Sequence, residues 1–271
     1  MHIPVLKKEV IEYLNPKPNE NFIDATLGFG GHTRAILEKI KPNGKVLGIE
    51  VDPEKKVEME RLELVHDSYS NLERIVKEKY DGILFDLGFS SYEIEKSGKG
   101  FSFQKNEFLD MRYSGEGLTA YEIVNSFSEK EIEKILREYG EERKSRKIAK
   151  AILRERKKGK IKTTFQLAEI IKKEVKGGRI HPATRTFQAL RIKVNDELNN
   201  LKKGLEQSLK VLKKGGKIVV ISYHSLEDRI VKRFFKENNL NILTKKPIRP
   251  SLTEIRENPK SRSAKLRAAK I

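Results

Sequence analysis

The chain has 271 residues, which is enough for one large domain or for a domain with an insertion, and either can bury a substantial core. It contains no cysteine, which excludes disulfides, thiolate metal sites and a cysteine nucleophile and fits a reducing cytoplasm. No run of about eighteen apolar residues occurs, so we expect a soluble, cytoplasmic protein that does not enter a membrane.

The charge balance is strongly basic. The 57 Lys and Arg against 39 Asp and Glu give a formal net charge of +18, which favours a polyanionic partner, with nucleic acid as the first candidate. A solvated, salt-bridged surface like that of heat-adapted proteins would have a similar composition. Charge alone therefore does not decide between these two interpretations.

Strand-like runs and helical patterns alternate in the first ninety residues. The runs cover residues 21–25, 46–51, 62–65 and 82–86, and this alternation is typical of a parallel, doubly wound α/β sheet. The next convincing strand, 217–222, comes much later. The sequence therefore predicts an insertion after the fourth strand.

The sequence between the fourth strand and the strand at 217–222 has helical patterns. Ser128 and Glu131 form a capping box that opens one helix, and Gly140 ends it. A second helix is predicted over 142–157, and a third runs from Thr163 and Gln166 to Gly177-Gly178. From Phe187 to Gly215 apolar residues keep a spacing of three or four, which predicts one long helix or two abutting helices.

These patterns define the expected domains. Residues 106–195 are predicted to form an inserted helical domain, and residues 1–105 and 196–271 to form the α/β core. The last stretch contains Lys260, Arg262, Lys265, Arg267 and Lys270 without an acid from residue 258 onward, so it is predicted to be disordered or to lie on an anion.

A glycine-rich turn follows the first strand. Gly28-Phe29-Gly30-Gly31 precedes a helix, and the next strand ends in Glu50 about twenty residues later, a spacing that suits an adenosine whose ribose diol binds the acid. A dinucleotide turn would need glycine where Thr33 stands, so S-adenosylmethionine is favoured over NAD. Asp24 could accept from the methionine ammonium. For the glycines alone, a flexible surface turn is the alternative.

Polar residues also follow the other strands. Asp67 is placed to bind an adenine amine, and Tyr69 either stacks on the ring or packs half-buried. Asp86 closes the fourth strand and could accept the protons of an amine during nitrogen methylation, although a turn or capping role is the alternative. His224 is either structural or meets the substrate. The five histidines lack metal-ligand spacing, so no metal is expected.

With these motifs the chain resembles the bacterial 16S rRNA (cytosine-N4)-methyltransferase family over almost its whole length. The resemblance rests on blocks at residues 2–6, 24–32, 86–91, 100–103, 109–112, 137–143, 181–191, 222–229 and 258–267. It implies a Rossmann-like class I methyltransferase core with an inserted helical domain that reads RNA. It also implies S-adenosylmethionine as cofactor and 16S rRNA within the small ribosomal subunit as partner.

The resemblance also implies site residues. Cofactor contacts would come from Gly30, Gly31, His32, Glu50, Tyr69 and Asp86, and Asp86 would be catalytic. Substrate contacts would come from Phe89, Ser90, Ser91, Arg185 and His224. Glu93 departs from the glutamine usual in the family and is not assigned a contact. Phosphates could bind Arg179, His181, Arg185, Arg191 and Lys193, unless Arg185 and Arg191 form buried ion pairs.

Two other functions remain open from the sequence. The first is a methyltransferase for another nucleic acid, although amino-methylating DNA enzymes usually carry Pro-Pro where this chain has Leu87-Gly88. The second is a non-catalytic RNA-binding factor in ribosome assembly. The oligomeric state is not predicted.

Overall fold

The computed structural model describes residues 4–88, 97–176, 178 and 180–271. The chain divides into two compact units: a core unit of residues 1–88 and 198–271, and a helical unit of residues 89–197. The first division comes earlier in the chain than the predicted one at 105/106. The reason is that Phe101 and Phe103 pack against the apolar cluster of the helical unit.

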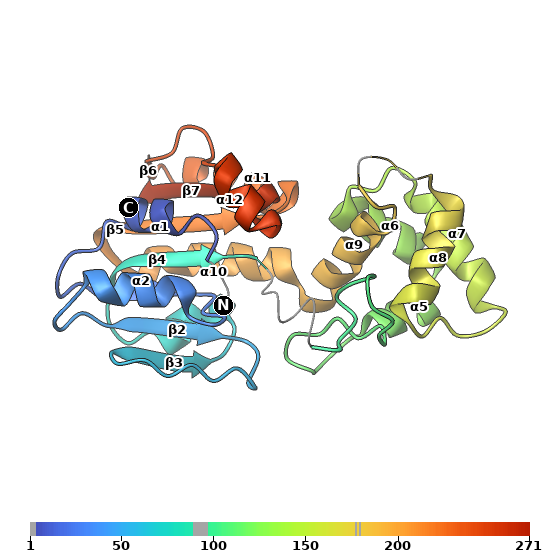
Figure 1. Cartoon of the computed structure of the whole chain (residues 1–271), viewed down its shortest axis with the longest axis horizontal. Helices are drawn as coiled ribbons and strands as arrows, with labels where there is room; N and C mark the ends of the chain where they lie inside the picture. Colours follow the sequence, from blue (N-terminus) through green and yellow to red (C-terminus); the bar gives the residue numbers. More distant parts are fainter. Residues whose placement is uncertain (1–3, 89–96, 177, 179) are drawn as a thin grey trace. The chain divides into compact units, whose positions relative to one another are not determined.

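The core unit is built on a seven-stranded sheet with the order β3-β2-β1-β4-β5-β7-β6 (Figure 1). Its strands are β1 (Phe22–Asp24), β2 (Val46–Glu50), β3 (Leu62–His66), β4 (Tyr80–Asp86), β5 (Leu212–Ser222), β6 (Asn241–Ile242) and β7 (Lys265–Lys270). The first five are parallel, while β7 runs antiparallel to β5 and β6. The predicted Rossmann-like α/β fold is confirmed.

Helices cover both faces of this sheet. The core-unit helices are α1 (Lys7–Leu14), α2 (Gly31–Lys39), α3 (Leu72–Ile75), α10 (Glu197–Val211, whose first residue belongs to the helical unit), α11 (Ser225–Glu237) and α12 (Leu252–Glu257). Successive residues of β4 point to opposite faces, so Leu84 packs with Leu14 and Ile36, and Phe85 packs with Leu205 and Phe235. No helix in the described residues is long and apolar enough to cross a membrane.

The helical unit contains α5 (Ala120–Ser126), α6 (Glu129–Gly140), α7 (Ser145–Arg156), α8 (Thr164–Glu174) and α9 (Thr184–Asn195). The capping boxes predicted at Ser128 and Thr163 are both present. Helix α8 ends at Glu174, before the glycines that were predicted to end it. Helices α9 and α10 abut at Asp196, whose φ of 49° breaks the helical path.

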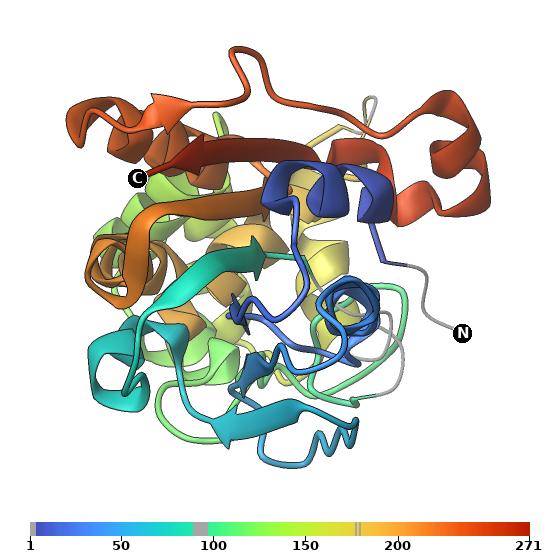
Figure 2. The same ribbon diagram turned by 90° about the vertical axis from the view of Figure 1, so that its left-hand side faces the viewer.

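The basic C-terminal tail was predicted to be disordered or to lie on an anion, and the first of these alternatives, disorder, is wrong. Residues 265–270 form β7, which lies between β5 and β6 (Figure 2). Leu266, Ala268 and Ala269 are buried, and Arg267 donates from Nε to Asp228 Oδ1 over 2.7 Å. The cationic residues of the tail therefore belong to a strand of the sheet, and Arg267 of this strand pairs with the Asp228 carboxylate of α11.

We expect Asp228→Asn to lower the free energy of unfolding by about 3 kcal/mol at neutral pH, since it leaves the buried Arg267 without its charge partner. Burial alone would raise the pKa of Asp228, but hydrogen bonds and charge from Arg267 and Lys265 outweigh it and hold that pKa below its ordinary value. The stabilisation is therefore present above the ordinary carboxyl pKa and is lost as pH falls through the lowered one.

Urea unfolding of both proteins from pH 7 down to pH 3 measures this difference. The exposed pair of Glu38 and Lys41 supplies the control, because Glu38→Gln is expected to leave stability unchanged. Equal stability of the wild type and Asp228→Asn at pH 7 would show that the pair does not hold β7.

Candidate cofactor and substrate site

Asp24, at the end of β1, anchors the glycine turn. Its Oδ2 accepts from Thr33 Oγ1 over 2.7 Å and its Oδ1 from the Thr26 amide over 3.3 Å. Burial raises the pKa of Asp24 above its ordinary value, although the hydrogen bond from Thr33 acts in the opposite direction. Asp24, which was predicted as one possible acceptor for a methionine ammonium, thus accepts from Thr26 of the turn and from Thr33 of α2.

The glycines bring backbone close to other groups. Gly28 and Gly30 have φ of 52° and 71°, in the left-handed region that glycine tolerates. A Cβ on Gly30 would lie 2.4 Å from Met59 Cε, and one on Gly31 would lie 2.6 Å from Pro4 Cγ. Met59 and Pro4 thus occupy the space that a side chain at these two positions would need, so the turn packs closely against neighbouring segments.

Glu50, at the end of β2, collects donors from the turn and from the loop after it. The Gly28 amide donates to Oε2 over 3.0 Å, while the Asp52 amide and Lys55 Nζ donate to Oε1 over 3.0 and 3.3 Å. Lys55 Nζ also lies 5.9 Å from the ring centre of Phe29. The glycine turn and Glu50, which the sequence spacing predicted to lie near each other, are thus in direct contact.

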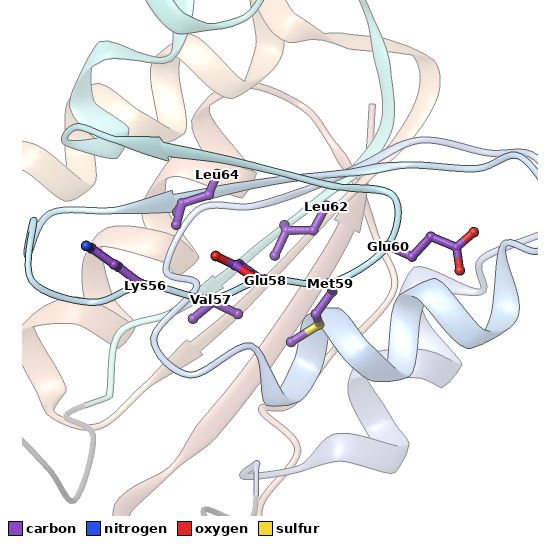
Figure 3. Close-up of a pocket in the computed structure, with 7 residues that line it drawn as sticks. All are labelled: Lys56, Val57, Glu58, Met59, Glu60, Leu62 and Leu64. Atoms are coloured by element: carbon purple, nitrogen blue, oxygen red, sulfur yellow. The ribbon is translucent and has the colours of Figure 1, made fainter.

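A cavity of about 540 Å³ lies beside this region, under the connection from β2 to β3 (Figure 3). It is lined by Lys56, Val57, Glu58, Met59, Glu60, Leu62 and Leu64. None of these is a predicted site residue. Val57 and Met59 also cover Gly30, so the loop that bounds the cavity separates it from the glycine turn.

Asp86, at the end of β4, accepts hydrogen bonds on one side of its carboxylate. Its Oδ1 accepts from the Gly88 amide over 3.1 Å and from the Tyr223 hydroxyl over 3.0 Å. Its own amide donates to Thr26 Oγ1 over 2.7 Å, which ties β4 to the turn after β1. Its Oδ2 faces His32 Nε2 at 3.5 Å. Asp86 thus holds the turn after β4 through Oδ1, while its Oδ2 lies on the side of His32.

Tyr223 was missed as a site residue. A Cβ on Gly88 would lie 2.6 Å from its ring, so the missing side chain lets the tyrosine reach Asp86. Burial, reinforced by the negative charge of Asp86, raises the pKa of the Tyr223 hydroxyl well above its ordinary value. The hydroxyl therefore stays protonated and remains a donor. The end of β5 marked the segment, but its partner is fixed only by the fold.

His32, the second residue of α2, is buried beside Asp86. Within the described residues neither ring nitrogen has a hydrogen-bond partner. Its Nε2 nevertheless lies 3.5 Å from Asp86 Oδ2, so the ring has an electrostatic partner although it makes no hydrogen bond. The strand ends thus bring together Asp24, His32, Asp86 and Tyr223, next to the turn that contacts Glu50.

Three other predicted residues have structural contacts. Tyr69 meets Phe85 edge to face, with ring centres 5.5 Å apart, and its ring lies against Gly204 of α10. Asp67 accepts from Ser68, Asn71 and Arg74, which engages both of its oxygens. His224 caps α11, accepting from the Glu227 amide over 3.4 Å. Tyr69 thus has a packing contact and His224 a capping contact within the protein.

The predicted phosphate-binding cluster is mostly engaged inside the helical unit. Arg191 forms a two-pronged, half-buried ion pair with Glu197 over 2.7 and 2.9 Å. Arg185 donates to the Glu141 carbonyl over 3.4 Å. The His181 ring stacks on Phe103. Phe89, Ser90, Ser91, Glu93 and Arg179 lie outside the described residues.

Comparison with known proteins gives full-length matches. The sequence profile of a family described as "MraW methylase family" matches residues 1–271. A protein of Dictyoglomus thermophilum is 51% identical over 98% of this chain and 95% of its own length. A second, of Caldicellulosiruptor saccharolyticus, is 47% identical over 99% and 98%. Both are named "Ribosomal RNA small subunit methyltransferase H".

Proposed function

The chain belongs to the MraW methylase family, and we propose that it methylates the exocyclic N4 amine of a cytidine in the decoding centre of 16S rRNA, using S-adenosylmethionine. One observation carries the proposal: Glu50 contacts the glycine turn, while Asp86 presents a carboxylate oxygen at the neighbouring strand end. The names of the full-length relatives support rRNA of the small subunit as substrate.

The residues present fit the cofactor. Glu50 would hold the ribose diol, the backbone of Gly30 and Gly31 would lie against the ligand, and His32, whose ring nitrogens make no hydrogen bond within the described residues, would gain one. Tyr69 and Asp86 complete the proposed contact set. When bound, S-adenosylmethionine supplies a methyl group made electrophilic by its sulfonium. A diol that donates to Glu50 Oε1 competes there with Lys55, so Lys55 would give up its present contact.

Asp86 would activate the amine. The lone pair of a cytosine amine is delocalised into the ring, and a hydrogen bond from the amine to Asp86 Oδ2 returns electron density to nitrogen. Gly88 and Tyr223 hold Oδ1, so Oδ2 keeps one orientation. Holding reactants in line can supply up to about 7–11 kcal/mol of the barrier, so a strong base is unnecessary.

The transfer balances without a further reactant. Nitrogen forms the new bond to carbon, the carbon–sulfur bond breaks with its electrons staying on sulfur, and nitrogen loses one proton. Asp86 Oδ2 would receive that proton, and His32 Nε2 lies 3.5 Å from it.

The substrate contacts rest on the family resemblance. Phe89, Ser90 and Ser91 follow Asp86 in the chain and would line the base, while Arg185 and His224 would contact the RNA. A base stacked in helical RNA cannot reach a buried methyl donor, so the cytidine would be splayed out.

The test is to incubate small subunits that lack the modification with this protein and methyl-labelled cofactor, and then to map the labelled nucleotide. The proposal requires label on the N4 amine of one decoding-centre cytidine. Label on another nucleotide or on DNA would show that the proposed substrate is wrong and would identify the actual one. Cofactor binding without transfer to any nucleic acid would instead favour the assembly-factor function.

A further inference from the structure

Cations are concentrated in one segment of the helical unit. Eleven of the 57 Lys and Arg, but only one of the 39 acids, lie between residues 143 and 162. The segment covers helix α7 and the loop that leads to α8 (Figure 1). Such a local excess of one charge raises the local concentration of anions far more than the same charges spread among acids.

One side of α7 is neutralised by its neighbours. Lys147 and Arg154 both pair with Glu174 of α8, over 3.4 and 2.7 Å, and Arg154 also pairs with Glu155. Lys158 pairs with Glu155 as well. These cations have counter-ions within the protein, so they are poor candidates for binding an external anion.

An adjacent face of α7 carries cations without such partners. Arg146, Lys150 and Lys157 are exposed, and in the part of the chain that the structure describes none of them pairs with a carboxylate. Their spacing of four and seven residues places them on one helix face, because four residues make about one turn. The backbone of Lys157 keeps helical angles, so the row spans about 16 Å.

We propose that this basic row, Arg146, Lys150 and Lys157, binds backbone phosphates of the substrate rRNA. The proposal rests on the proposed function and identifies an RNA surface different from the cluster expected around Arg185 and Arg191. Ile148 and Ile152 of α7 are fully buried, so the helix holds the row rigidly against its own unit. A fixed line of cations can contact successive backbone phosphates of a nucleic acid, and each contact releases counterions that were condensed on those phosphates.

The experiment is the salt dependence of binding of unmodified small subunits by the full-length chain. Arg146→Ala with Lys150→Ala is expected to lower the slope of log Kd against log salt by about one for each side chain. The KM for subunits rises in the same variant. Alanine keeps helix propensity, and both side chains are exposed, so folding is expected to survive; thermal unfolding checks this.

Lys232→Ala with Lys236→Ala is the matched control, because these exposed lysines have the same spacing on α11. The proposal requires the wild-type slope for this control. The proposal is overturned if the α7 variant keeps the wild-type slope of log Kd against log salt, or if both variants lower this slope equally. It is also overturned if the α7 variant weakens binding to subunits but not to protein-free 16S rRNA, since the row would then contact a ribosomal protein.

The measurement of binding does not depend on whether the protein transfers a methyl group. If the wild type binds subunits but transfers no methyl group, the proposed function fails, while the slopes of the two variants still decide the role of the row.

Discussion

Asp86→Asn is expected to lower the single-turnover rate of methyl transfer by about 100-fold, the lower end of what a positioned proton acceptor contributes. The Asn carbonyl can still accept from Gly88 and Tyr223, so the fold survives. Its amide then presents hydrogens toward the substrate amine, which needs an acceptor. Rapid mixing with labelled cofactor measures the rate, and thermal unfolding checks the fold.

Tyr223→Phe is the comparison for this prediction. It removes one donor to Asp86 Oδ1 and leaves the carboxylate, so its loss of rate is expected to be smaller than that of Asp86→Asn. A wild-type rate in Asp86→Asn would remove this carboxylate from the chemistry.

Glu50→Ala is expected to weaken binding of S-adenosylmethionine by about 100-fold, because hydrogen bonds to a charged group each contribute about 1.5–3 kcal/mol. The substitution also leaves the Gly28 amide and the Lys55 ammonium without their carboxylate, which loosens the turn. Calorimetric titration of the cofactor measures the change.

Glu54→Ala supplies the matched control, because this exposed acid lies in the same loop and is not a proposed cofactor contact. Its affinity for the cofactor is expected to equal that of the wild type. Equal affinities of Glu50→Ala and Glu54→Ala would mean that the ribose does not bind the acid of β2.

Much of the fold could be predicted because its signals are local. Strands β1 and β4 are buried on both faces and read as apolar runs, and the capping boxes at Ser128 and Thr163 fix helix starts through side chains three residues apart. Strand β7 was missed because cations interrupt its apolar residues, and its charge partner, Asp228, lies far away in the sequence.

The candidate site also has features that local spacing predicts and features that depend on contacts between distant residues. Spacing alone placed the glycine turn and Glu50 together, since both lie at carboxyl ends of adjacent parallel strands. The hydrogen bond from Tyr223 to Asp86 could not be predicted, because it joins residues 137 positions apart and depends on the missing side chain of Gly88. The same holds for Lys55, whose contact with Glu50 depends on how the loop after β2 folds back.

The most direct test is a crystal structure of the protein with S-adenosylhomocysteine. The account predicts the ribose hydroxyls on Glu50, the amino-acid part along Gly30 and Gly31, and the sulfur on the side where Asp86 Oδ2 and His32 face each other. A nucleoside in the cavity lined by Leu62 and Leu64, or anywhere else away from the glycine turn, would contradict it.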